Sequence, residues 1–105
     1  MNYEETLKEL KNAHGTVYTI TAPLNDDETE FSTVFLKKPN RAMHTLVGKL
    51  AVGSDPLRAV EAALKGLYIG GDKLESIMDN EDALMSCEGA IVDVMKKKEA
   101  VLKKN

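Results

Sequence analysis

The hydrophobic pattern of the chain is clearest over residues 31–72. Residues 31–36 are mostly β-branched, aromatic or leucine side chains, which favour a strand. Pro39 ends this strand because proline has no N–H to donate to a neighbouring strand. The next apolar residues recur at the spacing of one helix face, and they are Met43, Leu46, Val47, Leu50 and Ala51. This spacing predicts a helix over 41–52, with Asn40 as its N-cap.

A second helix is predicted over 56–68. A Ser-Asp pair supplies a capping side chain, and Pro56 in the first turn is typical of a helix start. One apolar stripe runs along this helix, formed by Leu57, Val60, Leu64 and Leu67. The Gly70-Gly71 pair is predicted to stop the helix in a turn, after which Asp72 can cap the next element.

Ahead of these helices, the pattern predicts a short helix and a β-hairpin. Residues 2–13 carry apolar side chains on one helix face, and so short a helix needs a partner surface to be stable. Residues 15–22 suit a strand that Pro23 closes, and an acidic turn over 24–29 leads to the strand at 31–36. Because a lone hairpin is unstable in water, its apolar face must pack on helices or its edge must pair with another chain.

The chain is predicted to end in one long helix. Residues 73–78 suit one or two helical turns, and Asp79 or Asn80 then caps a helix that continues to about residue 103. Its length would be roughly 35 Å at ~1.5 Å per residue. Acidic residues in its first turn and lysines in its last turns complement the helix dipole. Its apolar positions are Leu84, Cys87, Ile91, Val94, Met95, Val101 and Leu102.

Together these elements predict a single domain over residues 1–105, of the α+β class and mainly helical. Residues 1–14 form a short helix, 16–36 a β-hairpin and 41–104 the helical part. The hairpin is expected to pack on a bundle of three to four helices. The alternative is a purely helical bundle in which residues 16–36 are irregular.

Composition narrows the class of protein. The apolar content of 43% and the charged content of 30% are close to the globular average, and the net charge of −3 argues mildly against a dedicated nucleic-acid binder. A single cysteine excludes an intramolecular disulfide. No apolar run approaches the ~20 residues that span a bilayer, and no secretory segment is recognisable. We therefore expect a soluble cytoplasmic protein without membrane contact.

The side chains that could take part in catalysis or ligand binding do not form a recognised catalytic or metal-binding motif. The acidic turn lacks the ligand spacing and the glycine of an EF-hand loop, so a solvated turn is favoured for Asp26, Asp27, Glu28 and Glu30. The segment Gly70-Gly71-Asp72 has fewer glycines than a phosphate-binding loop and no Lys-Ser/Thr pair. It is therefore interpreted as a turn.

Cys87, His14 and His44 are the soft or imidazole ligands of the chain, and they are fewer than the four that structural zinc requires. Cys87 lies on an apolar stripe, which favours a buried thiol. His44 adjoins a core position and is interpreted as a helix-surface or boundary residue. We therefore expect no enzyme activity, no metal and no cofactor.

The C-terminal lysines allow two interpretations. They are either a solvated helix end or a contact for nucleic acid or an acidic partner. The aromatic residues that single-strand binders use for base stacking are missing from this region, so the solvated end is favoured. The lysines concerned are Lys96, Lys97, Lys98, Lys103 and Lys104.

Three motifs in a fixed order resemble a known group of proteins. They are FLKKPNR at 35–41, DPL at 55–57 and LYIGGD at 67–72, followed by a charged C-terminal segment. This series resembles small proteins encoded in tailed phages and prophages of Bacteroides-type gut bacteria, over roughly residues 16 to 104. Many of those proteins resemble phage tail assembly chaperones.

The resemblance implies a non-enzymatic role in tail morphogenesis. Such chaperones bind the long helical tape-measure protein, keep it soluble and recruit tail-tube subunits, and they are absent from the finished virion. The resemblance carries over no catalytic residue and no cofactor. The alternatives are a structural virion component, such as a head–tail connector or tail subunit, and a small nucleic-acid-binding regulator that uses the Lys-rich C-terminus. A homo-oligomer through the hairpin edge is a further option.

The faces of the two central helices are the predicted contact surface for a protein partner. Methionine is flexible and small alanine side chains allow close approach, so these faces suit an amphipathic partner helix. The predicted binding residues are Met43, Leu46, Val47, Leu50, Val60, Leu64 and Leu67.

Overall fold

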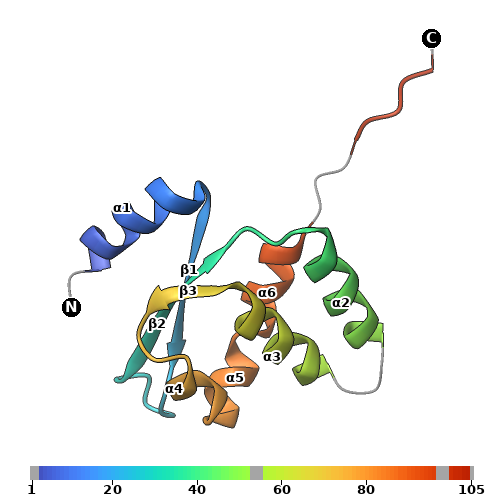
Figure 1. Cartoon of the computed structure of the whole chain (residues 1–105). Coiled ribbons are helices and arrows are strands. Elements are labelled where there is room, and N and C mark those ends of the chain that lie inside the picture. Colours follow the sequence, from blue (N-terminus) through green and yellow to red (C-terminus); the bar gives the residue numbers. More distant parts are fainter. Residues whose placement is uncertain (1–2, 53–55, 97–99, 105) are drawn as a thin grey trace.

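A computed structural model describes residues 3–52, 56–96 and 100–104 of the chain (Figure 1). Within these ranges it combines helices with one antiparallel sheet, so the protein belongs to the α+β class, as predicted. In chain order the elements are α1 (Tyr3–His14), β1 (Val17–Pro23), β2 (Phe31–Lys37), α2 (Arg41–Val52), α3 (Pro56–Leu67), β3 (Tyr68–Gly71), α4 (Glu75–Met78), α5 (Glu81–Ser86) and α6 (Glu88–Met95).

The strands form a sheet in the order β1-β2-β3, with β2 in the middle. β1 pairs with β2 along its whole length, from Val17 opposite Lys37 to Pro23 opposite Phe31. This pairing confirms the predicted β-hairpin and excludes the alternative in which this region is irregular. β3 pairs with the other side of β2, with a register shift next to Phe35.

The Gly70-Gly71 pair lies in β3, so the predicted turn at this position is wrong. Gly71 has a φ of +98°, and a Cβ atom there would lie 2.5 Å from the carbonyl oxygen of Thr33. A Cβ atom at Gly70 would lie 3.1 Å from a methyl carbon of Leu10 on α1. The two glycines therefore let β3 approach both β2 and α1 closely, because they have no side chain in the way.

Helices lie on both faces of the sheet. On one face, the Phe35 ring meets the ring of Tyr3 from α1 edge to face, with 6.1 Å between their centroids. Successive side chains of a strand alternate between faces, so Val34 and Leu36 point to the opposite face. There they are fully buried in the main core with residues from α3, α5 and α6. The sheet thus separates α1 from the other helices (Figure 1), which differs from the predicted packing of a hairpin on a single bundle.

The two central helices form where the sequence predicts them. α2 spans 41–52, as predicted, and the backbone N–H of Met43 donates to the side-chain oxygen of Asn40 at 2.9 Å. α3 starts at Pro56 and ends at Leu67, one residue before its predicted end, because the chain passes directly into β3. The two shorter helices predicted at 2–13 and 73–78 correspond to α1 and α4.

The predicted single long helix at the C-terminus is wrong. Asn80 caps its start as predicted, because its side-chain oxygen accepts from the backbone N–H of Ala83 at 3.0 Å. The helix is then divided at Cys87 into α5 and α6. Each piece buries its own apolar residues in the main core, Ala83 and Leu84 in α5 and Ile91 and Val94 in α6.

α6 ends at Met95, well short of the predicted end near residue 103. Segment 100–104 contains no helix, and its Val101 and Leu102 side chains are 93% and 96% exposed. Residues 97–99, to which the same prediction applies, lie outside the described residues. The described part of the tail has no packed face, and a short helix without one is only marginally stable in water. The lysines of segment 100–104 therefore do not complement a helix dipole, contrary to the prediction.

Candidate functional site

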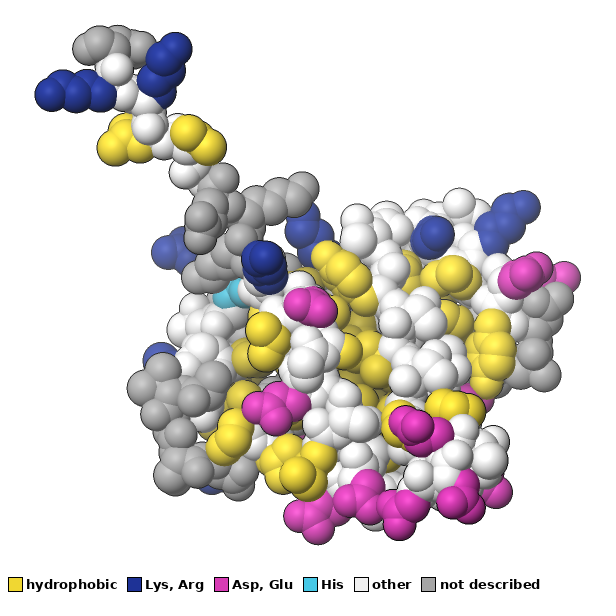
Figure 2. Space-filling view, turned by 180° about the vertical axis from the view of Figure 1, so that it is seen from behind, with side chains coloured by type: hydrophobic (Ala, Val, Ile, Leu, Met, Phe, Trp, Pro, Cys, Tyr) yellow, Lys and Arg dark blue, Asp and Glu magenta, His cyan; other side chains and the backbone are white. Residues whose placement is uncertain are grey.

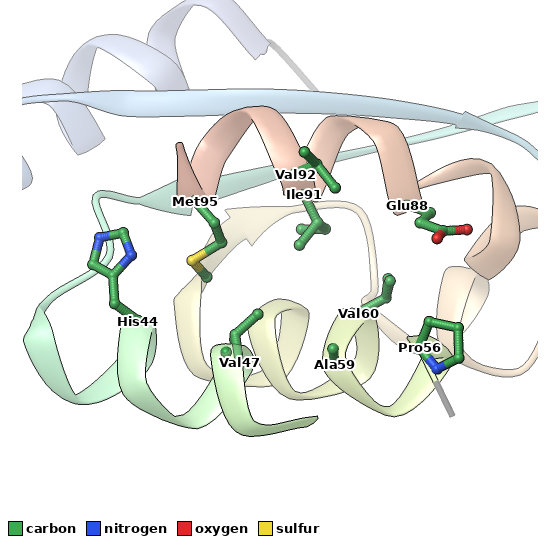
Figure 3. Close-up of a pocket in the computed structure, with 10 residues that line it drawn as sticks. His44, Val47, Pro56, Ala59, Val60, Glu88, Ile91, Val92 and Met95 are labelled. Atoms are coloured by element: carbon green, nitrogen blue, oxygen red, sulfur yellow. The ribbon is translucent and has the colours of Figure 1, made fainter. Parts of the chain in front are cut away.

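An open hollow lies between α2, α3 and α6, and we call it the α2–α3–α6 groove. Its volume is about 320 Å³. Figure 3 shows Val47 and Val60 on one side, facing Ile91 and Met95 on the other. The residues that line it are His44, Val47, Gly48, Pro56, Ala59, Val60, Glu88, Ile91, Val92 and Met95.

The floor of the groove is continuous with the main core, whereas its rim is open. Val60 and Ile91 are buried and belong to the core. At the rim, Val92 is 63% exposed, and a Cβ atom added at Gly48 would meet no atom within 4 Å. The groove is thus a hollow in an apolar surface that a ligand can fill without displacing a side chain.

Two polar side chains mark the ends of the groove. His44 of α2 lies at the same end as Met95, and Glu88 lies at the other end with Pro56 (Figure 3). The lining between them is apolar or glycine. Such a distribution suits an elongated apolar ligand that carries polar or charged groups at its ends.

The structure brings only part of the predicted binding surface together. Val47 and Val60 both line the α2–α3–α6 groove. Leu64 and Leu67 lie in the main core and are 0% exposed, so a partner cannot reach them in this conformation. Both side chains therefore stabilise the fold. For the other predicted binding residues, a role in binding stays a prediction.

The other predicted binding residues lie on different sides of α2. Met43 and Leu50 are partly buried and pack against the main core. Leu46 is 45% exposed and lies outside the groove. It belongs to a shallow hollow lined by Arg41, Ala42, Thr45, Leu46 and Lys49.

The sequence did not predict that α6 forms one wall of the α2–α3–α6 groove. The sequence pattern places Ile91 and Met95 on the buried stripe of a long helix. It does not predict that a groove lies beside them. Two signals were available in the sequence: Val92 is an apolar residue outside that stripe, and Gly48 is a glycine inside a helix. The half-buried position of His44 confirms its interpretation as a boundary residue.

The thiol of Cys87 is buried, as predicted, and belongs to the main core. Burial raises the pKa of this thiol, and a hydrogen bond with Ser86 lowers it to a smaller extent. A raised pKa keeps the thiol protonated at neutral pH, and the protonated form is the unreactive one. Cys87 is therefore a packing residue.

Asp72 does not cap a helix, contrary to the prediction. One oxygen of its carboxylate accepts from the backbone N–H of Thr33 at 2.8 Å, and the other accepts from the hydroxyl of Tyr3 at 2.7 Å. The hydrogen bond to Asp72 is the main cause that raises the pKa of Tyr3. α4 begins after Leu74 without a side-chain cap. The carboxylate thus ties the end of β3 to β2 and to α1.

The acidic turn between β1 and β2 is organised by an amide side chain. The oxygen of the Asn25 side chain accepts from the backbone N–H groups of Thr29 and Glu30 at 3.0 and 3.3 Å. The acidic residues of this turn are exposed. Within the described ranges, no group of three or more His, Cys, Asp or Glu side chains is placed to hold a metal ion.

α1, α2 and α3 have 12 residues each, whereas a membrane-spanning helix needs about 20. Among the residues that the structure describes, no helix is long and apolar enough to cross a membrane. Comparison with protein-family models, with curated proteins and with solved structures gave no match.

Proposed function

We propose that the protein is a non-enzymatic binding protein that holds an apolar helical segment of another protein in the α2–α3–α6 groove. The observation that carries this proposal is the open apolar hollow between His44 and Glu88. Its volume of about 320 Å³ corresponds to roughly ten water molecules at ~30 Å³ each. Transfer of these waters from an apolar lining to bulk solvent favours the binding of an apolar ligand.

The dimensions of the groove suit about two turns of a partner helix. Its α6 wall runs from Glu88 to Met95, a length of about 12 Å at ~1.5 Å per residue. A helix of that length offers apolar anchors at positions i, i+3 or i+4, and i+7 on one face. A lysine or arginine flanking these anchors would meet Glu88, and a polar residue at the other end would meet His44.

We further propose that the partner is the tape-measure protein of a tailed phage or prophage. The protein would then act as a tail assembly chaperone in the cytoplasm of the host cell. This proposal is supported by the resemblance of the motifs at 35–41, 55–57 and 67–72. A long tape-measure helix exposes apolar stripes that aggregate unless they are covered, and several copies of the groove can cover successive turns.

Co-expression with the tape-measure protein of the same phage or prophage genome tests this proposal. The measured quantity is the amount of tape-measure protein in the soluble fraction. Gly48→Lys places a charged side chain in the groove at a position with free space around its Cβ. Gly89→Lys is the matched control, because Gly89 is also an exposed helical glycine with no atom within 4 Å, and it lies outside the groove lining.

The wild-type protein and Gly89→Lys should keep the tape-measure protein soluble, and Gly48→Lys should return it to the insoluble fraction. A soluble amount that does not depend on the protein at all contradicts the role as a tail chaperone. An equal soluble amount with both lysine variants contradicts the groove as the binding surface, whatever the partner is.

A further inference from the structure

We infer that segment 100–104 of a second copy of the chain occupies the α2–α3–α6 groove when no other partner is bound. This inference rests on the proposed function of the groove as a binding surface. The anchors would be Val101 and Leu102, and the groove would receive them between Val47, Val60 and Ile91. The protein would then associate with itself through its own C-terminal tail.

Val101 and Leu102 are more exposed than any other large hydrophobic residue in the described part of the chain. They are 93% and 96% exposed, whereas the next, Val92, is 63% exposed and lies on the rim of the groove. Figure 2 shows hydrophobic side chains on the projecting tail, followed by lysine side chains at its end. Two adjacent apolar side chains in water gain free energy when an apolar hollow takes them up.

The charge of the tail is opposite to the charge of the rest of the chain. Through Met95, nine Lys and Arg residues stand against sixteen Asp and Glu residues, which gives a net charge of −7. Residues 96–105 contain five lysines and one glutamate, which gives +4. Glu88 in the groove lining supplies a local negative charge for Lys103 or Lys104 once the apolar pair is seated. The tail of one copy is therefore attracted to the body of another.

The occupant is the tail of a second copy because the chain cannot easily return to its own groove. Met95 lines the groove, and Lys96 then leaves with an extended backbone, at φ −62° and ψ 123°. A return would require a reversal within residues 96–99, whose sequence Lys-Lys-Lys-Glu contains none of the residues that favour turns. Segment 100–104 lies clear of the body (Figure 1).

Two copies that exchange tails form a closed arrangement. Each groove is filled, and both Val101-Leu102 pairs leave water, so no binding surface remains for a third copy. In this dimer the groove is shielded until a partner helix with more anchors displaces the tail. The dimer should weaken as ionic strength rises, because salt screens the attraction between tail and body.

Sedimentation equilibrium of the full chain, treated with nuclease and kept at low salt, tests this inference. The tail variant Val101→Ser/Leu102→Ser removes the anchors, and the groove variant Gly48→Lys blocks the receiving site. Each should raise the dimer Kd by at least about tenfold. The controls are Met85→Ser, which removes a hydrophobic side chain that is 52% exposed outside the groove, and Gly89→Lys. Both controls should keep the wild-type Kd.

A mixture of the tail variant with the groove variant provides the sharpest readout. Each variant associates more weakly with itself than the wild type does, but the first has an intact groove and the second an intact tail. The mixture should therefore form a heterodimer and contain more dimer than either variant alone. Any one of four results would overturn the inference. The wild type could be monomeric, both variants could keep the wild-type dimer Kd, the mixture could contain no heterodimer, or nuclease could abolish the dimer. In any of these cases, a tail variant that still keeps the tape-measure protein soluble leaves the proposed function standing.

Discussion

Glycine has opposite roles in two regions of the molecule. One is the junction at which β3 pairs with β2, and the other is the α2–α3–α6 groove. At the junction there is no room, since a Cβ atom at Gly71 would lie 2.5 Å from the carbonyl oxygen of Thr33. Both oxygens of the Asp72 carboxylate are hydrogen-bonded there. In the groove, a Cβ atom at Gly48 would meet no atom within 4 Å, and the apolar floor stays open.

This difference separates the part of the molecule that holds the fold from the part that is available to a partner. Close packing at the junction means that any added atom must displace backbone. The groove tolerates added atoms because the fold does not depend on filling it. Substitutions at the junction and in the core should therefore change the free energy of unfolding, whereas substitutions at the groove should change binding.

The largest effect on stability is expected from Leu64→Ala. Leu64 is 0% exposed in the main core, so the substitution leaves a cavity and should lower the free energy of unfolding by about 3 kcal/mol. Urea denaturation followed by circular dichroism measures this change. A loss below about 1 kcal/mol would show that Leu64 does not support the fold. The same residue would then return as a candidate for partner contact.

Gly71→Ala should have the next largest effect. The positive φ and the short approach to Thr33 both oppose a side chain, so the free energy of unfolding should fall by about 2 kcal/mol. Gly89→Ala is the control, because its Cβ atom would have free space. Equal unfolding curves for the two variants would contradict the close packing of β3 against β2.

Asp72→Ala should lower the free energy of unfolding by about 1.5 kcal/mol, because it leaves the backbone N–H of Thr33 without its carboxylate acceptor. Tyr3→Phe removes only the exposed hydrogen bond to the same carboxylate, so its effect should be about 0.5 kcal/mol. Thermal unfolding of the two variants side by side gives the comparison. A larger loss of stability from Tyr3→Phe than from Asp72→Ala would contradict the conclusion that the hydrogen bond from Thr33 contributes more than the one from Tyr3.

An effect of small size and opposite sign is expected from Gly48→Ala. Alanine has a higher helix propensity than glycine and has free space at this position, so the free energy of unfolding should rise by about 0.7 kcal/mol. Chemical denaturation resolves a change of this size when both proteins are measured together. A loss of stability would mean that the groove is closed in solution.

Local signals were sufficient to predict most elements of this fold. Asn40 and Pro56 mark the starts of α2 and α3, because a cap and a first-turn proline act within a few residues. The hairpin follows from the alternation and the turn between β1 and β2. β3 could not be predicted in the same way. It has four residues, two of them glycine, and it is a strand because β2 lies beside it.

The end of α6 and the groove depend on packing between distant segments. The residues after Met95 have good local helix propensity, yet the helix stops where contact with the core ends. Periodicity in α2, α3 and α6 identifies the side of each helix that faces inward. It does not show where three helices leave a gap, so the sequence could not predict that Gly48 and Val92 line the same groove.

Site-specific photo-crosslinking tests most directly whether the groove is the binding surface. A benzophenone amino acid replaces Val92 on the groove rim, or Met85 as a control that is also exposed but lies outside the lining. Both proteins are co-expressed with the tape-measure protein, irradiated and mapped by mass spectrometry. The expected result is an adduct from position 92 to an apolar helical segment of the partner, with none from position 85. Adducts of equal yield from both positions, or from position 85 alone, would contradict a binding role for the groove.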